Sequence, residues 1–281
     1  INGDAFSDEV KTEMVDLIRE HSQRVDLVVY SLAAPVRTDP DTGETYRSVI
    51  KPIGEPFCAR TLDAGTGKVE KVHLEPADED EIKSTVKVMG GEDWRRWIDF
   101  LENSGVLAEG AMTVAYSYIG PSFTSEIYRD GTIGKAKEHL ESTAKAIDAS
   151  GHKTDVRAYL SVNKALVTRA SAVIPVVPLY IALLYKVMKS KGIHEDCIHQ
   201  IARLFSDRLY RNGDVPVDKE GRIRLDDLEM RPDVQEEVRR YMNAPDDELR
   251  EQADFAGYWE AFLRFHGFGV EGVDYSQDVE P

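Results

Sequence analysis

The stretch Ala115–Leu140, AYSYIGPSFTSEIYRDGTIGKAKEHL, joins a short apolar strand to a helix and sets the pattern of the chain. Tyrosines end the strand, and Tyr128 follows ten residues after Tyr118. A glycine-containing turn at 130–134 then opens a helix that carries Lys137. A phenol can donate a proton, and a nearby ammonium stabilises the phenolate and donates to ribose hydroxyls. Tyrosine and lysine at a strand end therefore suit hydride transfer from a nicotinamide cofactor.

The spacing of Tyr128 and Lys137 makes a geometric demand. On one continuous helix, residues nine apart point about 180° away from each other, at roughly 100° per residue. If the two side chains cooperate, the backbone has to break between them, at Asp130-Gly131 and at Gly134. The alternative is a surface turn followed by an ordinary helix whose lysines face solvent. Spacing alone leaves both interpretations open.

Three β-prone runs separated by helical patterns predict a parallel sheet. The runs start at Val25, Met112 and Val156, and the valine-rich run Val25–Tyr30 reads as a buried strand. Small residues at 31–34 would let a ligand approach the backbone. We expect an α/β protein with a doubly wound, Rossmann-type parallel sheet, a hairpin insertion and C-terminal helices. Helical patterns cover 5–20, 79–88, 92–103 and the segment that ends near residue 150.

Two segments depart from the alternation of strands and helices. Residues 35–88 contain turn signals at 39–43 and 63–67 between β-prone runs, which predicts a β-hairpin or flap insertion. Residues 169–212 include an apolar run too short and too rich in proline for a membrane span, so we expect a substrate-covering helical part. The whole chain, 1–281, then forms a single catalytic domain.

The two ends of the chain carry further signals. Ile1-Asn2-Gly3-Asp4 reads like the end of a strand already under way, and no GxGxxG or P-loop occurs in the sequence. We therefore expect a missing N-terminal dinucleotide-binding βαβ portion. Near the other end, 214–225 predicts a hairpin or strand pair around Glu220-Gly221, and 246–265 reads as helical.

Composition restricts the class of function. The 281 residues are 42% hydrophobic and 31% charged, as in soluble globular proteins, with a formal net charge of −16. A negative field argues against nucleic-acid binding, although a few local cations suffice for an anionic cofactor. The two cysteines, Cys58 and Cys197, provide no disulfide framework, which favours a reducing cytoplasm.

Two other clusters have structural explanations. Tyr185 and Lys189 have the Tyr-x3-Lys spacing that short-chain dehydrogenases use on one helix face. They follow the third strand rather than the second, so we interpret them as structural, with a short-chain ketoreductase as the alternative. His194, Cys197 and His199 scatter around a helix without an evident fourth ligand, so no metal site is predicted.

Several motifs together resemble a known family. They are VVYSLAAPVRTDPDTG, VKVMGGEDW, AYSYIGP, the Tyr128-x8-Lys137 spacing, NKALVTRASAVIPVVPLY and DFAGY. In combination they are similar to the trans-2-enoyl-CoA reductases and V-type bacterial enoyl-ACP reductases, large relatives of the short-chain dehydrogenases. The similarity extends from Gly3 to about Tyr275. Intact members of that family resemble one another in a further N-terminal dinucleotide-binding portion.

The resemblance implies NADH-dependent reduction of the carbon–carbon double bond of trans-2-enoyl thioesters, enoyl-CoA or enoyl-ACP, in bacterial fatty acid synthesis. It implies that Tyr128 is the catalytic proton donor and that Tyr118 binds the substrate carbonyl. The cofactor contacts that it implies are Asp4, Ala5, Leu32, Ala33, Lys137, Leu166, Val167 and Thr168. We expect a cytoplasmic monomer with no nucleic-acid partner and no membrane span. The alternative is a non-catalytic or incomplete nucleotide-binding fragment that needs its missing N-terminal part.

Overall fold

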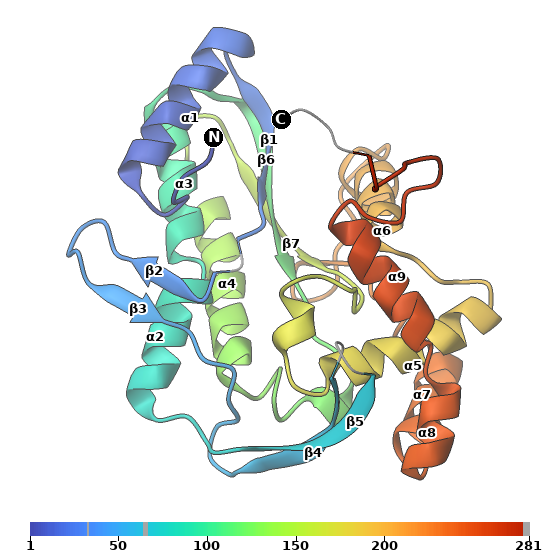
Figure 1. Cartoon of the computed structure of the whole chain (residues 1–281). Helices are drawn as coiled ribbons and strands as arrows, with labels where there is room; N and C mark the ends of the chain where they lie inside the picture. Colours follow the sequence, from blue (N-terminus) through green and yellow to red (C-terminus); the bar gives the residue numbers. More distant parts are fainter. Residues whose placement is uncertain (33, 64–66, 278–281) are drawn as a thin grey trace. The chain divides into compact units, whose positions relative to one another are not determined.

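The computed structural model describes residues 1–32, 34–63 and 67–277, which form two compact units (Figure 1). The first unit consists of Ile1–Phe57, Leu74–Asn163 and Arg211–Arg224, and the second consists of Cys58–His73, Lys164–Tyr210 and Leu225–Pro281. Residues 35–88 contribute to both units. The expected single domain, with a 35–88 insertion and a 169–212 covering part, stays a prediction.

A parallel sheet forms the centre of the first unit. Its strands are β1 (Val25–Tyr30), β6 (Leu107–Ser117), β7 (Arg157–Val162) and β8 (Arg222–Arg224), in the order β1-β6-β7-β8. The pairings of β1 with β6, β6 with β7, and β7 with β8 are all parallel. In register, Tyr30 pairs with Ala115 and Ser117 pairs with Val162. The predicted α/β class with a parallel sheet is confirmed.

The expectation that β1 is a buried strand is wrong. Among its residues only Tyr30 is buried, and Val29 is 40% exposed. The reason lies in the strand order, because β1 is the outermost strand of the described sheet and pairs with β6 alone. An apolar run gives the β-propensity of a strand but not its place in the sheet.

The hairpin predicted at 214–225 is also wrong. Only β8 forms there, and it pairs with β7 instead of with a strand of its own segment. A turn at Asp218–Gly221 precedes it, in which the Asp218 N–H donates to the Arg222 carbonyl at 2.8 Å. Ile223 is fully buried between two arginines. Three residues are too few to show a periodicity that distinguishes a sheet strand from a hairpin arm.

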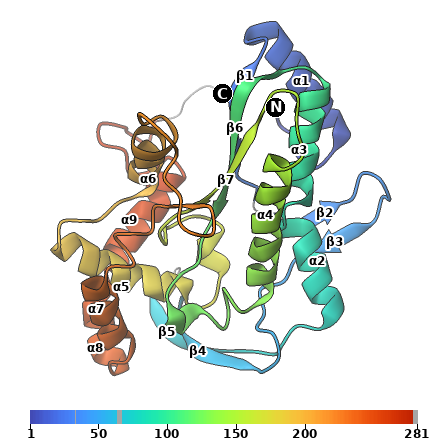
Figure 2. The same cartoon turned by 180° about the vertical axis from the view of Figure 1, so that it is seen from behind.

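Helices α1 (Asp8–His21), α3 (Glu92–Asn103) and α4 (Thr132–Asp148) lie along one face of this sheet, as both views show (Figures 1 and 2). Trp94 and Ile98 of α3 and Leu140 of α4 are buried against the strands. Each such side chain contributes about 1.5–3 kcal/mol when fully buried. The apolar periodicity of these helices therefore fixes the face that they turn to the sheet.

Side chains cap two of the helix starts. Ser7 caps α1 by accepting the Val10 N–H at 3.2 Å. Asp78 caps α2 (Glu79–Met89) in a capping box, in which Asp78 accepts the Glu81 N–H and the Glu81 carboxylate accepts the Asp78 N–H.

Two small hairpins occupy 35–77. Strands β2 (Val36–Thr38) and β3 (Thr45–Arg47) are antiparallel, and the turn between them closes with the Asp39 N–H donating to the Glu44 carbonyl. This confirms the turn predicted at 39–43. Strands β4 (Phe57–Asp63) and β5 (Lys68–Leu74) form a separate two-stranded sheet. Residues 64–66 of the second predicted turn lie outside the described residues.

The helices of the second unit pack around α5 (Val177–Ser190), most of whose residues are buried. It contacts α7 (Pro232–Met242) and α9 (Phe255–Phe265). The remaining elements are the 3-10 turns η1 (Ser122–Thr124, first unit) and η2 (Ser171–Val173), α6 (Cys197–Leu204), the π turn η3 (Phe205–Leu209) and α8 (Asp246–Gln252). Among the described residues no helix has both the length and the apolar character that a membrane span requires.

Candidate functional site

Two tyrosines meet at the carboxyl end of β6. Tyr118 follows the last residue of the strand, and the Tyr128 ring contacts the Tyr118 ring edge-on with centroids 4.9 Å apart. Tyr128 is buried, and its burial raises the pKa of the phenol above the usual value. A phenol in such an environment keeps its proton at neutral pH and can donate it to a base that forms beside it.

The backbone breaks between Tyr128 and Lys137, as their spacing demands. Tyr128 lies in a turn, and α4 begins only at Thr132 after Gly131 in an extended conformation. A Cβ atom on Gly134 would lie 1.7 Å from the Arg129 carbonyl oxygen, so the chain folds back at a distance that glycine alone permits. The predicted bend at 130–134 is therefore confirmed.

Lys137 reaches the same strand end from α4. Its Nζ donates to the carbonyl oxygen of Tyr116 at 3.2 Å, and Tyr116 is two residues before Tyr118. Burial lowers the pKa of Lys137 to about 8. Within the described part of the chain no carboxylate lies in ion-pair distance of its Nζ, so its remaining donors are available to a bound molecule.

Gly120 supports this arrangement and was not singled out from the sequence. Its φ is +74°, and a Cβ there would lie 2.9 Å from both the hydroxyl oxygen and Cε1 of Tyr118. Glycine is thus required twice, once by the backbone conformation and once by the phenol that packs over it. The signal in the sequence was the Gly120-Pro121 pair directly after a strand.

The first pair of expected cofactor residues, Asp4 and Ala5, forms a fixed turn before α1. Asp4 is exposed, and its carboxylate accepts the N–H of Phe6 at 3.0 Å. The Ala5 carbonyl accepts from Trp97 Nε1 at 3.1 Å and from Lys11 Nζ at 3.3 Å. The backbone of this segment is therefore held by side chains from α1 and α3.

The second pair, Leu32 and Ala33, follows the carboxyl end of β1. Leu32 is 39% exposed there, where an apolar surface can support a bound ligand. Ala33 lies outside the described residues. The structure therefore places Leu32 at the strand edge where ligands of parallel α/β sheets bind.

The third group, Leu166, Val167 and Thr168, belongs to the second unit, whereas the tyrosines and Lys137 belong to the first. Tyr185 fixes this segment by accepting the Val167 N–H with its hydroxyl at 3.3 Å. Ser171 Oγ donates to the Leu166 carbonyl at 2.7 Å and accepts the Thr168 N–H at 2.9 Å. The segment is thus well defined within its own unit.

The remaining clusters have ordinary partners. Lys189 forms an ion pair with Asp254 at 2.6 Å, and Tyr185 is engaged with Val167. The three residues weighed as metal ligands face different groups. His194 packs on the Tyr185 ring, Cys197 Sγ lies 3.8 Å from the Val167 carbonyl, and His199 Nδ1 contacts Asp196 at 2.6 Å.

A parallel sheet with a phenol and an ammonium at the end of one strand defines a Rossmann-type α/β protein. The model of the "trans-2-enoyl-CoA reductase catalytic region" matches residues 1–210. The model of the "enoyl reductase FAD binding domain" matches residues 217–279. The chain therefore belongs to the trans-2-enoyl-CoA reductase family.

Characterised relatives cover nearly the whole chain. An enoyl-[acyl-carrier-protein] reductase [NADH] of Flavobacterium johnsoniae is 58% identical over 99% of this chain and 71% of its own length. A trans-2-enoyl-CoA reductase [NADH] of Treponema denticola is 54% identical over 100% of this chain and 70% of its own. The crystal structure of the Treponema denticola enzyme with NAD matches 99% of this chain and 70% of that one, with a TM-score of 0.93 and 53% identity.

The name of the second family model implies a flavin, and the residues of 217–279 do not fit one. A dinucleotide pyrophosphate binds where helix N-termini leave N–H groups free for an anion. Here the starts of α7, α8 and α9 carry Asp233, Asp246 and Asp254. Asp254 already accepts the Gly257 N–H at 2.9 Å. Carboxylates at these positions repel a pyrophosphate, so no chemistry is assigned to a flavin.

Proposed function

We propose that this protein is an NADH-dependent reductase of the carbon–carbon double bond in trans-2-enoyl thioesters, carried on CoA or acyl-carrier protein. The observation that carries the proposal is the buried Tyr128 phenol, packed against Tyr118 at the end of β6 and followed by a break in the backbone before α4. The family membership supports the same activity, because the relatives named above are NADH-dependent reductases of enoyl-CoA or enoyl-acyl-carrier protein.

The chemistry needs a hydride and a proton at adjacent carbons. NADH, when bound, supplies the hydride for the β-carbon of the enoyl thioester. Negative charge then develops on the thioester oxygen, where a donor placed in advance stabilises it. We assign that donor role to the Tyr118 hydroxyl and the proton transfer to the Tyr128 hydroxyl. The raised pKa of Tyr128 keeps the phenol protonated until the enolate beside it needs a proton.

The residues proposed to hold the cofactor are those expected from the sequence. Lys137 would donate to ribose hydroxyls with the N–H groups that Tyr116 does not use. Asp4, Ala5 and Leu32 would contact the dinucleotide in the first unit. Ala33, Leu166, Val167 and Thr168 complete the proposed set of cofactor contacts.

The decisive experiment measures NADH oxidation with crotonyl-CoA and with a crotonyl carrier protein. In Tyr128→Phe the rate should fall by about 10²–10⁴-fold, the usual worth of a general acid, while the circular dichroism spectrum stays that of the wild type. Tyr185→Phe tests the ketoreductase alternative, since it removes the hydroxyl that a ketoreductase would use. Because that hydroxyl also accepts the Val167 N–H, the two variants are compared at saturating NADH. Full activity in Tyr128→Phe, or its loss in Tyr185→Phe alone, would contradict the assignment.

We also propose that the enzyme acts as a cytoplasmic monomer. Support comes from the net charge of −16, which disfavours self-association, and from cysteines that are unpaired. Light scattering of the purified protein that gave twice the mass of one chain would contradict the monomer.

A further inference from the structure

A buried ion pair lies behind the turn formed by residues 4–6. Lys11 Nζ is 3.0 Å from Asp93 Oδ1, and both side chains are 1% exposed. The ammonium also donates to the Phe6 carbonyl at 2.8 Å and to the Ala5 carbonyl at 3.3 Å. An ammonium has three donors, so each is accounted for: one on the carboxylate and two on consecutive backbone carbonyls.

The same carboxylate is tied to the end of β1. The hydroxyl of Tyr30 donates to Asp93 Oδ2 at 3.3 Å. Tyr30 is the last residue of β1 and lies two residues before Leu32. One buried carboxylate therefore links the turn at residues 4–6 to the strand end that carries Leu32.

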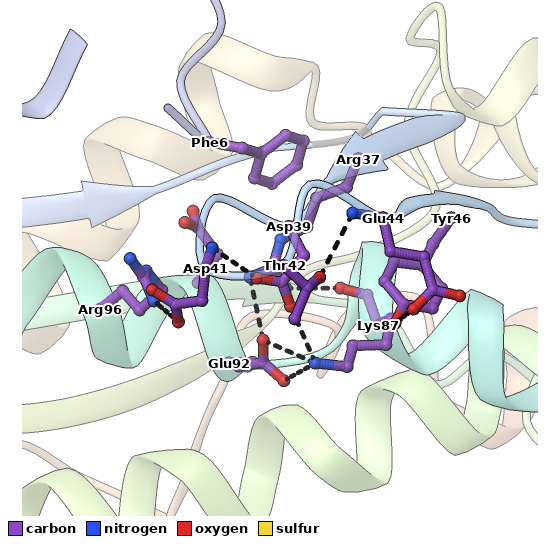
Figure 3. Close-up of polar contacts among 12 residues, drawn as sticks. Phe6, Arg37, Asp39, Asp41, Thr42, Glu44, Tyr46, Lys87, Glu92 and Arg96 are labelled. Atoms are coloured by element: carbon purple, nitrogen blue, oxygen red, sulfur yellow. Dashed lines mark hydrogen bonds and ion pairs between the residues drawn. The ribbon is translucent and has the colours of Figure 1, made fainter. Parts of the chain in front are cut away.

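A second cation closes the turn from the β2–β3 hairpin. The Arg37 guanidinium lies 5.6 Å from the centre of the Phe6 ring, and Figure 3 shows Arg37 beside Phe6. Arg37 is itself fixed, because it donates to the Lys87 carbonyl at 2.7 Å and to Glu92 at 3.0 Å. Phe6 is buried between these groups. The turn is thus held on its carbonyls and on its aromatic side chain.

Stability is a weak explanation for this pair. The desolvation of two buried charges offsets most of their attraction, and apolar replacements of buried pairs are often neutral or stabilising. In agreement, burial raises the pKa of Asp93 above its usual value, although Lys11 and Arg37 both act to lower it. The pair instead fixes the position of the backbone, because its hydrogen bonds join the carbonyls of Ala5 and Phe6 to Tyr30 at the end of β1.

We propose that Lys11 and Asp93 are positioning residues for the dinucleotide. They hold the carbonyls of Ala5 and Phe6 in a fixed relation to the carboxyl end of β1, so that Asp4, Ala5 and Leu32 present one preformed surface. The role rests on the proposed NADH-dependent function, and neither side chain touches the cofactor itself. Their effect is therefore on cofactor binding and not on the chemical step.

The test compares cofactor affinity with stability in the full-length natural protein. Lys11→Met keeps most of the length of the unbranched side chain and removes its donors. We expect the Kd for NADH, from fluorescence titration, to rise about tenfold, the effect of losing about one charge-assisted hydrogen bond. The kcat at saturating NADH and the KM for crotonyl-CoA should change less than about twofold. The double variant Lys11→Met with Asp93→Asn should raise the Kd for NADH by a similar factor, and it leaves no unpaired buried charge.

Val15→Ala is the matched control, because Val15 lies on the same helix, is also buried and has an apolar side chain that cannot donate to the turn carbonyls. It should lower the melting temperature and leave the Kd for NADH unchanged. An unchanged Kd in both Lys11 variants, or an equal rise in Val15→Ala, overturns the positioning role. A wild-type protein that binds no NADH overturns the proposed function as well, and the wild-type titration distinguishes that failure from the first.

Discussion

The two units fix their proposed cofactor segments with buried charges of opposite sign. In the first unit the Lys11 ammonium holds the carbonyls of Ala5 and Phe6. In the second unit the fully buried Glu229 carboxylate accepts the Ala165 N–H at 2.7 Å, directly before Leu166. Of the two backbone groups, an ammonium can bind only the carbonyl oxygen and a carboxylate only the N–H, so the sign of the charge follows from the backbone group that each segment presents.

The two arrangements differ in how the charge is balanced. Lys11 has Asp93 in direct contact, whereas the partners of Glu229 include the neutral hydroxyl of Tyr180 at 2.6 Å. Burial raises the pKa of Glu229, although Tyr180 and the cation of Lys164 act to lower it. The first unit thus holds its turn through a contact ion pair, whereas in the second unit the carboxylate accepts from the Ala165 N–H and the Tyr180 hydroxyl while the Lys164 cation acts on it electrostatically.

The largest effect is expected on the free energy of unfolding when each acid is truncated, and this experiment tests the difference in charge balance. Asp93→Ala leaves the Lys11 ammonium buried without a counter-charge and should lower the free energy of unfolding by about 3–5 kcal/mol. Glu229→Ala removes the acceptor of the Ala165 N–H and of the Tyr180 hydroxyl, and it should lower the free energy of unfolding by about 1–3 kcal/mol. Chemical denaturation followed by circular dichroism measures both. Glu79→Ala, at an exposed helix start, is the control and should change it by less than about 0.5 kcal/mol. The reverse order would contradict the assigned balance of charge.

Much of the fold follows from local sequence patterns. Local patterns predict α1, α3 and the strands β1, β6 and β7 of the parallel sheet, and Ser7 and Asp78 mark helix starts, because these signals depend on neighbours in the chain. The place of β1 at the edge of the sheet and the existence of β8 depend on strand order, which no local pattern contains.

The candidate site also contains features that local sequence predicts and features that it does not. The bend between Tyr128 and Lys137 could be predicted, since it follows from helix geometry and the intervening glycines. Lys11 and Asp93 could not, because they lie 82 residues apart and each occurs among other charged residues on a helix. In the sequence such residues look like a solvated face, and only the packing of α1 against α3 buries them together.

A smaller effect concerns the pH dependence of the catalytic step in the first unit. Burial lowers the pKa of Lys137 to about 8, so its ammonium is present below that pH and lost above it. If the cation supports catalysis, kcat/KM for NADH should fall about tenfold per pH unit above about 8. Lys137→Arg keeps the charge and should move this fall to higher pH. The exposed neighbour variant Lys135→Arg should leave the profile in place, and a fall unchanged in Lys137→Arg would exclude Lys137 as its origin.

The smallest effect concerns acid stability in the second unit. His194 packs edge-on against Tyr185 at 4.3 Å, and its Nδ1 is buried without a partner among the described residues. Burial lowers the pKa of His194 to about 4, and the cation of Lys164 acts in the same direction. The folded protein therefore keeps this ring neutral, while the unfolded chain takes up a proton as the pH falls below its ordinary value of 6.5.

Linkage then fixes the sign of the expected change. The contribution of His194 to stability is intact above about pH 6.5 and is lost progressively as the pH falls toward about 4. At pH 5 the full shift corresponds to about 2 kcal/mol, and we expect about half of it because the ring is only partly buried. Urea denaturation of the wild type and of His194→Phe between these pH values measures the free energy of unfolding of each. The stability of the wild type relative to His194→Phe should fall as the pH is lowered. The control variant is His21→Asn, because His21 is exposed at the end of α1 in the first unit and its replacement leaves the His194 ring and its neighbours unchanged. Because Tyr185 holds both the His194 ring and the Val167 N–H, acid should loosen the segment 166–168 before it affects the turn held by Lys11. Amide hydrogen exchange of the two segments at about pH 5 can show that order, and earlier exchange at residues 5 and 6 would contradict it.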